Sequence, residues 1–246
     1  MTEIKAIGDS AIQVSFGNQI NEEIHSEIQQ FLTSLRDEKI KGMIEWVPAY
    51  CTVAIYYQPE IISHDDLEKI LKRMLSTSTH KMKQDKGMVY EIPVYYGGET
   101  GPDLSFVASY HQLSEEEVIS LHTSKEYLIY MMGFVPGFPY LGGLPPSLAI
   151  PRLEHPRSSV QAGAVGIGGN QTGIYPSEVP SGWRIIGITP VPLFDVNRPS
   201  PFLFSAGNYI KFHSIDLQEY KRIKQLIANN TYELKTYKRE KKNDND

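Results

Sequence analysis

The sequence lacks several features that define whole classes of protein. Cys51 is its one cysteine, which excludes disulfide frameworks and cysteine-based zinc sites and fits a reducing compartment. No run of about 18 apolar residues is present, so no membrane-spanning helix is expected. The N-terminus has neither the basic nor the apolar region of an export signal, and the seven histidines show no metal-ligand spacing. We therefore expect a cytoplasmic protein without a metal site.

An excess of positive charge is also missing. The 246 residues include 24 basic and 29 acidic side chains, which give a net charge of -5. Neither a basic excess nor a basic stripe is present, so we expect no nucleic-acid partner and no anionic membrane surface as partner. With 41% hydrophobic and 22% charged residues the chain is globular, and its length suits one large or two modest domains.

Glycine and proline are concentrated in one stretch of the chain. Residues 127–210 hold 12 of the 19 glycines and 12 of the 16 prolines, with seven charged residues and no lysine. Helices tolerate neither residue well, so this stretch is predicted to form short strands joined by specific turns. The remainder shows helical periodicity and ordinary charge density. The chain thus has one part rich in glycine and proline and another part with helical periodicity. This difference predicts either two domains or one domain with an inserted barrel.

The N-terminal part reads as two strands and a helix, repeated once. Asn21 can cap the first helix, and Ser63 with Asp66 can start the second. This order predicts a small ferredoxin-like α/β layer with both helices on one face. The predicted strands and the polar linker that follows them are residues 5–7, 11–16, 43–47, 52–57 and 76–86.

The C-terminal part begins with a predicted strand over residues 88–96. Asp103 is predicted to cap a short helix, and Ser114 with Glu117 forms a capping box for a second helix. A further helix is predicted over residues 217–227, and the final residues, 238–246, are predicted to form a solvated tail. The predicted organisation is an α/β domain with its linker, a barrel domain, and a C-terminal helix and tail, at residues 1–86, 87–215 and 216–246.

Three stretches within the glycine- and proline-rich part could carry chemistry. In residues 133–145 aromatic residues alternate with glycine and proline, which suits a loop that presents rings to a groove or a lid that packs on its own core. Pro151-Arg152 and Pro156-Arg157 could hold two guanidinium groups in a fork for a carboxylate or phosphate. Structural arginines that tie loops to carbonyl groups are the competing interpretation, and the absence of lysine favours a site.

The third stretch, residues 162–176, has five glycines among residues 163–173. Such glycines let backbone amides approach an oxyanion or phosphate, although glycines at barrel corners would give the same composition. The stretch matches neither a P-loop nor a dinucleotide fingerprint. The chain also lacks the GxSxG and HExxH motifs, so a self-contained nucleophilic hydrolase is not expected.

Taken together, these motifs resemble the family named for subunit 1 of allophanate hydrolase. That family contains the B-type subunit of 5-oxoprolinase and the sporulation kinase inhibitor KipI. The resemblance runs from Gly8 to Phe212. Its most specific segments are residues 101–104, 133–145, 151–157, 169–176, 182–183 and 187–190. The chain departs from the family pattern at Ser181, Ile188 and Asn208, where a glycine, an arginine and an aspartate are usual.

The resemblance implies an α+β fold, in which a small ferredoxin-like N-terminal α/β domain precedes a cyclophilin-like β-barrel domain. It implies a hydrolase component, inactive alone, that cleaves 5-oxo-L-proline to L-glutamate at the expense of ATP. The implied partners in a hetero-oligomer are a second cyclophilin-like protein, which is the C-type 5-oxoprolinase component, and the A-type lactam-utilisation component. Which of the components binds ATP is left open.

The chemistry of that reaction suggests roles for particular residues. A lactam resists hydrolysis, so its carbonyl oxygen needs phosphorylation before water attacks, and the site needs a cation for the carboxylate and donors for developing charge. We expect Arg152 and Arg157 to supply the cation. The donors are expected from the backbone of residues 166–173, including Gly168 and Gly169, with Gln171 and Thr172. The expected groove walls are Phe134, Phe138, Tyr140, Tyr175 and Trp183, and the candidate general bases are Tyr140, His122 and His155.

Two other functions remain open. The same aromatic groove could dock on the helical hairpin of a sensor histidine kinase and block its autophosphorylation without chemistry, because aromatic residues anchor interfaces equally well. The missing nucleophile and nucleotide loop favour this inhibitor, whereas the arginine pair in a charge-poor stretch favours the enzyme. Peptidyl-prolyl isomerase activity rests on fold analogy alone, which does not establish function.

Overall fold

A computed structural model describes residues 2–77 and 87–239. The chain divides into two compact units, Met1–Asp85 and Lys86–Asp246. Most of the predicted linker, residues 78–86, lies outside the described residues. Within the described part of the chain, no helix combines the length and apolar character needed to cross a membrane. Each unit has a hydrophobic core of its own.

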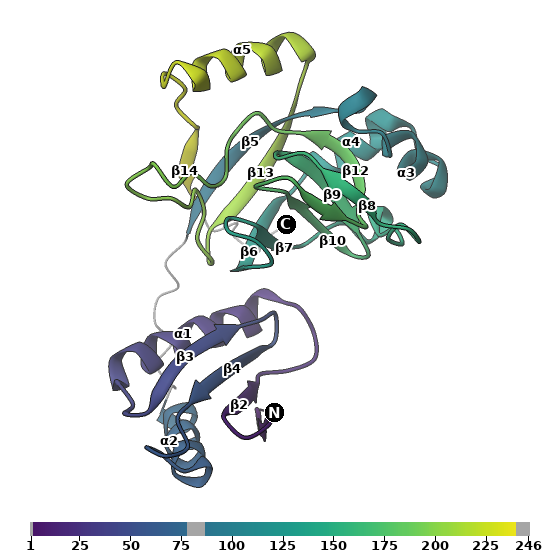
Figure 1. Cartoon of the computed structure of the whole chain (residues 1–246). Coiled ribbons are helices and arrows are strands. Elements are labelled where there is room, and N and C mark those ends of the chain that lie inside the picture. The colour runs from purple at the N-terminus through teal and green to yellow at the C-terminus, as the bar shows by residue number, and fades with distance from the viewer. Residues whose placement is uncertain (1, 78–86, 240–246) are drawn as a thin grey trace. The chain divides into compact units, whose positions relative to one another are not determined.

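The first unit is a two-layer α/β structure (Figure 1). Its four strands form an antiparallel sheet in the order β1-β2-β4-β3. All six elements predicted from the sequence are present. Their bounds are β1 Glu3–Ala6, β2 Ala11–Ser15, α1 Glu22–Glu38, β3 Met43–Pro48, β4 Thr52–Tyr57 and α2 His64–Thr77.

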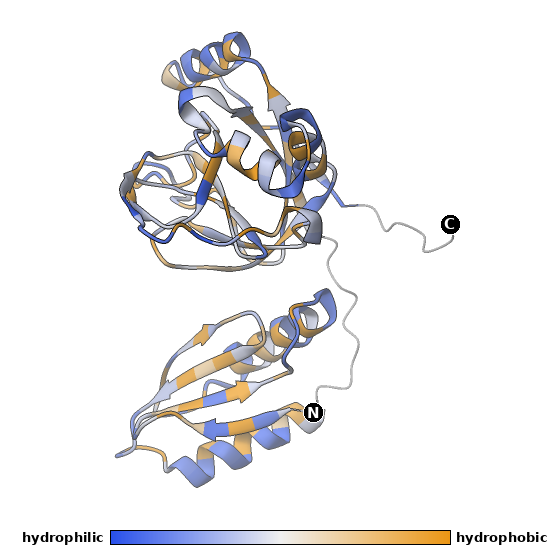
Figure 2. Ribbon diagram, turned by 90° about the vertical axis from the view of Figure 1, so that its right-hand side faces the viewer, coloured by the Kyte–Doolittle hydropathy of each residue, from blue (hydrophilic) through white to orange (hydrophobic). Residues whose placement is uncertain are grey.

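Both helices cover the same face of this sheet. Ile12 pairs with Ile55 and Val14 with Val53, so these side chains point to one side, where they pack with the buried stripes of α1 and α2. The helices show the matching alternation of polar and apolar positions (Figure 2). The predicted cap is confirmed, because the Asn21 side chain accepts the amide proton of Ile24 at 2.8 Å. The expected arrangement of this unit is therefore confirmed.

The second unit is built around an eight-stranded sheet. Its helical elements are η1 Gly98–Thr100, α3 Leu104–His111, α4 Glu115–Thr123, η2 Pro146–Leu148 and α5 Leu217–Ala228. Its strands are β5 Met88–Tyr96, β6 Glu126–Met132, β7 Pro139–Gly142, β8 Arg157–Val160, β9 Ala164–Gly168, β10 Gln171–Ile174, β11 Val179–Ser181, β12 Arg184–Ile188, β13 Tyr209–Ile215 and β14 Thr236–Lys238.

The main sheet curls into a nearly closed barrel. Its strand order is β10-β9-β12-β5-β13-β6-β7, with β14 added to β5. The two ends of this order meet, because a Cβ added at Gly173 in β10 would lie 3.5 Å from the carbonyl oxygen of Pro139 in β7. Strands β8 and β11 pair with each other outside this sheet. The expected combination of an α/β unit and a β-barrel is thus confirmed, and the barrel includes β5, which precedes α3 and α4.

Three expectations differ from the structure. The Asp103 side chain makes no hydrogen bond to the start of α3, because its carboxylate is bound elsewhere, whereas the predicted capping box of Ser114 and Glu117 is present. Strand β14, Thr236–Lys238, pairs with β5 and was not predicted, and its last residue, Lys238, was expected in the solvated tail. The segment 216–246 was expected to be separate from the barrel, but α5 and β14 both contact β5 and belong to the second unit.

Candidate functional site

An open pocket of about 210 Å³ lies beside the barrel, where β7, β11 and the loops before β7, β8 and β12 come together. Aromatic rings form most of its wall, and Arg152 supplies its guanidinium group. Its lining residues are Phe134, Phe138, Tyr140, Arg152, Tyr175, Pro180, Ser181, Gly182 and Trp183. The five aromatic residues that the sequence assigned to a groove therefore lie in one place, together with one of the two predicted arginines.

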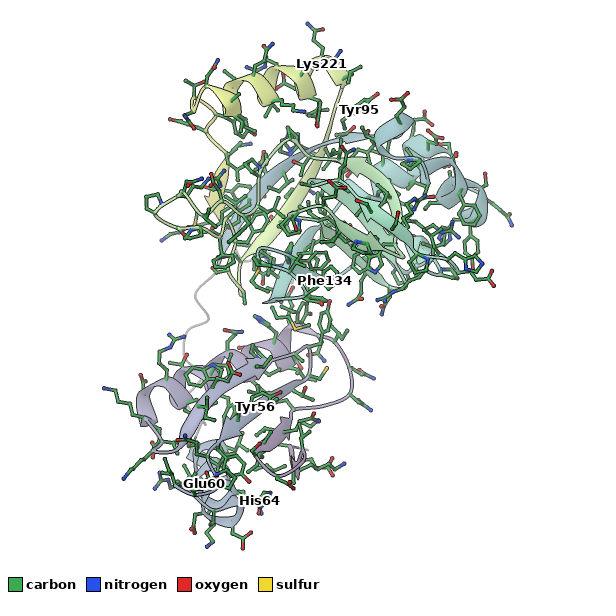
Figure 3. The ribbon with its side chains drawn as sticks, viewed as in Figure 1. Tyr56, Glu60, His64, Tyr95, Phe134 and Lys221 are labelled. Atoms are coloured by element: carbon green, nitrogen blue, oxygen red, sulfur yellow. The ribbon has the colours of Figure 1, made fainter. Side chains whose placement is uncertain are left out.

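The ring of Phe138 is the centre of the aromatic wall. It is buried, and the rings of four neighbours meet it edge to face at centroid distances of 5.2–5.8 Å. Such edge-to-face contacts stabilise a fixed arrangement of rings. These neighbours are Phe134, Tyr140, Tyr175 and Trp183. Phe134 (labelled in Figure 3) is 61% exposed and forms the outer edge of the wall.

Polar groups in the pocket are few and specifically placed. The Arg152 guanidinium carbon lies 5.8 Å from the centre of the Trp183 ring, and Arg152 is exposed. The hydroxyl groups of Tyr175 and Ser181 are 2.6 Å apart. Burial raises the pKa of Tyr175, so its phenol stays protonated near neutral pH. The pocket thus offers a cation and neutral hydroxyl groups against an apolar wall.

Arg157 does not join Arg152, so the expected fork of two arginines is not formed. Arg157 lines a different cavity of about 210 Å³, together with residues of η1 and β8. Its Nη2 donates to the Asp103 carboxylate at 2.8 Å, and its Nη1 donates to the Trp183 carbonyl at 3.4 Å. The alternative interpretation of a structural arginine describes Arg157 better, because it binds a carboxylate and a carbonyl group within the protein.

The glycine-rich hairpin of β9 and β10 lies behind the aromatic wall. Gly168 pairs with Gln171 in the ladder, and the Gly169 amide donates to the Ile150 carbonyl at 2.8 Å. Thr172 is buried, and its hydroxyl donates to the Gly166 carbonyl at 3.0 Å. The Gly169 amide and this hydroxyl are engaged within the fold, so they do not contribute to the expected cradle for developing negative charge.

The hairpin glycines make room for rings. A Cβ added at Gly168 would lie 2.4 Å from Cδ1 of Trp183, and one at Gly173 would lie 3.1 Å from both Phe138 and Trp183. No side chain larger than hydrogen fits at Gly168 without moving the indole. The high glycine content of this hairpin suggested backbone amides exposed to a ligand. It instead reflects close packing of the pocket wall on the barrel.

The candidate general bases are dispersed. His155 is exposed and does not line the pocket, whereas Tyr140 does. His122 is fully buried, and burial lowers its pKa from 6.5 to about 3. Its Nδ1 lies 2.8 Å from the Tyr96 hydroxyl and its Nε2 lies 2.8 Å from the Thr172 hydroxyl. His122 is a neutral member of a hydrogen-bonded chain in the barrel core, so it does not serve as a base for the pocket.

Sequence reasoning missed two residues that organise the pocket. Ser181 bridges Tyr175 to the Trp183 amide, and Asp103 binds Arg157 and β12. Both belonged to segments singled out in the sequence, Ser181 as a departure from the family pattern. Their roles depend on which strands pair, and this is not visible in the local sequence.

Comparison with known proteins places the chain in a family. The family model described as "Carboxyltransferase domain, subdomain C and D" matches residues 2–204. The chain belongs to this family. One similar relative is the 5-oxoprolinase B-type component of Bacillus subtilis, which is 39% identical over 233 residues. That match covers 91% of this chain and 97% of the relative.

Solved structures that resemble this chain share its fold. The crystal structure of TTHA0988 is 36% identical with a TM-score of 0.72, and the match covers 84% of this chain. The crystal structure of the Kluyveromyces lactis urea carboxylase has a TM-score of 0.81 at 18% identity, over 96% of this chain. The chain spans 40% of the first and 24% of the second, so it corresponds to one part of each longer polypeptide.

Proposed function

We propose that this chain is the B-type component of an ATP-dependent 5-oxoprolinase, which cleaves 5-oxo-L-proline to L-glutamate together with partner proteins. The match to the corresponding Bacillus subtilis 5-oxoprolinase component over nearly the full length of both chains supports this proposal. The observation that carries it is the pocket in which the Arg152 guanidinium stands beside an aromatic wall. The partners proposed are the second cyclophilin-like component and the lactam-utilisation component, and the isolated chain is expected to be inactive.

The pocket suits a small lactam that carries a carboxylate. The Arg152 fork would bind the carboxylate through two charge-assisted hydrogen bonds. The flat lactam ring would lie against the rings of Phe138 and Trp183, which exclude water from one side of the reacting carbonyl group. The Tyr140 hydroxyl would donate a hydrogen bond to that carbonyl oxygen. In this proposal the chain binds and orients the substrate, and Arg157 does not contact it.

The nucleotide is assigned to another component of the complex. When bound, ATP supplies the phosphoryl group that activates the lactam carbonyl oxygen. The hairpin that sequence reasoning considered for anion binding does not fit a triphosphate, because its Gly169 amide and the ladder between Gly168 and Gln171 are engaged within the protein.

The test is ATP-dependent glutamate release by the complex reassembled from this chain and its A-type and C-type partners. Arg152→Gln removes the proposed carboxylate contact. A charge-assisted hydrogen bond contributes about 1.5–3 kcal/mol, so KM is expected to rise roughly tenfold to a hundredfold. Arg222→Gln, on the exposed surface of α5, is the matched control and is expected to leave KM unchanged. An unchanged KM in Arg152→Gln would remove Arg152 from the site.

Kinase inhibition remains a second candidate, favoured by the exposure of Phe134 at the pocket edge. Exposed aromatic residues often anchor protein interfaces. If the pocket docks on a sensor histidine kinase, the purified chain will reduce autophosphorylation of a sporulation-type kinase, and Phe134→Ala will weaken this effect. Inhibition by the chain without any glutamate release by the assembled complex would favour this candidate over the enzyme.

A further inference from the structure

Asp103 and Arg157 form a pair behind the pocket wall. Asp103 is 6% exposed, and both of its carboxylate oxygens are bound. Oδ1 accepts from Nη2 of Arg157 at 2.8 Å, and Oδ2 accepts from the backbone amide of Ile185 at 2.7 Å. The backbone amide of Asp103 in turn donates to the Ile185 carbonyl at 2.9 Å. Asp103 therefore joins the start of α3 to β12 and fixes the guanidinium of Arg157.

Arg157 extends this link to Trp183. The other terminal nitrogen of its guanidinium group, Nη1, donates to the Trp183 carbonyl at 3.4 Å. Arg157 also lies opposite Ser181 in the pairing of β8 with β11, and the Ser181 hydroxyl accepts the Trp183 amide proton at 3.0 Å. The two polar backbone groups of Trp183 are thus both held by side chains, one from each strand of this pair.

The indole that these contacts anchor fits its surroundings closely. It lies directly over Gly168, and its ring meets Phe138 and Tyr175 at centroid distances of 5.8 and 6.1 Å. Trp183 is 7% exposed, yet it forms part of the pocket wall. Because packed interiors leave little free space, a small shift of the Trp183 backbone must move the indole and reshape the wall.

We propose that the Asp103–Arg157 pair is a positioning device for Trp183, so that Arg157 shapes the ligand pocket without touching the ligand. Arg157 reaches the Trp183 backbone from the side of a separate cavity, away from the aromatic wall. A forked guanidinium is suited to this task, because it binds a carboxylate and a carbonyl at the same time. The consequence for substrate binding rests on the proposed function, but the consequence for Trp183 does not.

The first test measures Trp183 itself in the full chain. Trp46→Phe leaves Trp183 as the one tryptophan of the sequence. Arg157→Gln is expected to shift the Trp183 emission to longer wavelength and to increase its quenching by acrylamide. Arg157→Lys, which keeps the charge but loses the fork, is expected to show the same change to a smaller degree and carries the test if Arg157→Gln does not fold. Wild-type emission and quenching in these variants would overturn the proposal.

The second test uses the neutral double variant. Arg157→Gln alone leaves a buried carboxylate without its partner, whereas Asp103→Asn with Arg157→Gln removes both charges and leaves two amides that can bond to each other. The double variant lacks the donor to the Trp183 carbonyl as the single variant does, so it is expected to keep the shifted Trp183 emission. Arg222→Gln is the control that is expected to change nothing. Wild-type emission in the double variant would show that the unpaired carboxylate, and not the lost bond to Trp183, causes the shift, and this would overturn the proposal.

Activity of the assembled complex separates positioning from direct contact. Positioning predicts that Arg157→Gln raises KM about tenfold with kcat largely kept, and that this rise accompanies the shift of the Trp183 emission. A guanidinium that bound the substrate directly would raise KM in Arg157→Gln while the Trp183 emission of the substrate-free chain stayed at its wild-type value, which would overturn the proposal. If the wild-type complex releases no glutamate, the proposed function fails, while the emission measurements still decide the role of the pair.

Discussion

Phe134 has a backbone conformation that residues other than glycine rarely adopt. Its φ is +62°, and the Val135 amide donates to the Gly133 carbonyl at 2.7 Å, which closes a γ-turn around it. Turns of this kind are strained, and such strain is concentrated at binding sites. The turn places an exposed ring at the edge of the pocket. We interpret the strain as the cost of presenting this ring to a ligand.

The strain at Phe134 predicts an unusual order of stability. Phe134→Gly is expected to be more stable than Phe134→Ala by about 1 kcal/mol, because glycine adopts positive φ freely and alanine does not. Urea unfolding of both variants measures the difference. At Ser158, an exposed position in β8 without positive φ, the alanine variant is expected to be at least as stable as the glycine variant. The same order at both positions would contradict strain at Phe134.

His122 makes the stability of the barrel unit depend on pH. Its pKa is about 3 in the folded protein and near 6.5 when unfolded, because burial disfavours the charged ring. The unfolded chain therefore binds the additional proton, and the stability present above pH 6.5 is lost progressively as the pH falls towards 3. Between pH 7.5 and 5.5 the expected loss from this group is about 1.4 kcal/mol.

The measurement compares the wild type with His122→Gln at both pH values by urea unfolding, followed through Trp183 in the Trp46→Phe background. His213, whose pKa is also lowered by burial, is present in both proteins and cancels in the comparison. His122→Gln is expected to be less stable at pH 7.5 but to lose less stability on acidification. Equal losses in the two proteins would mean that His122 is not the responsible group.

At the scale of elements, local sequence signals predicted the helices and strands well. Contacts that depend on pairing between distant strands could not be predicted in this way. The helices were predicted from apolar spacing and from caps such as Asn21 and Ser114, whose partners lie within three residues along the chain. Asp103 has the same local signal, yet its partners are Arg157 and Ile185, which lie 54 and 82 residues away. A local pattern cannot distinguish a cap from such a long-range link.

The candidate site shows the same limit. Composition predicted the grouping of the aromatic residues, because an apolar stretch rich in glycine and proline has few other ways to bury its rings. The direction of Arg157 follows from the pairing of β8 with β11, which sets it opposite Ser181. The role of Gly168 follows from the position of Trp183 above it. Both features depend on tertiary structure, which a local sequence pattern does not contain. The sequence-based prediction therefore treated residues that are close along the chain as close in space.

At the scale of the whole molecule, the chain consists of two units with separate hydrophobic cores. The core of the first unit draws its residues from the sheet and helices before residue 78, and the buried clusters of the second come from residue 92 onward. Each unit also contains one tryptophan, Trp46 in the first and Trp183 in the second. The two units can therefore be followed separately in one polypeptide.

Separate cores predict separate unfolding. Leu71 is fully buried in the first unit, so Leu71→Ala is expected to destabilise that unit by about 2–5 kcal/mol. In the Trp183→Phe background the Trp46 transition should move to lower urea concentration, while in the Trp46→Phe background the Trp183 transition should stay in place. Ile223→Ala, which truncates a buried residue of α5, should affect the Trp183 transition alone. Equal shifts of both transitions with either substitution would show that the two cores unfold as one cooperative structure, because a local cavity then lowers the stability of the entire chain.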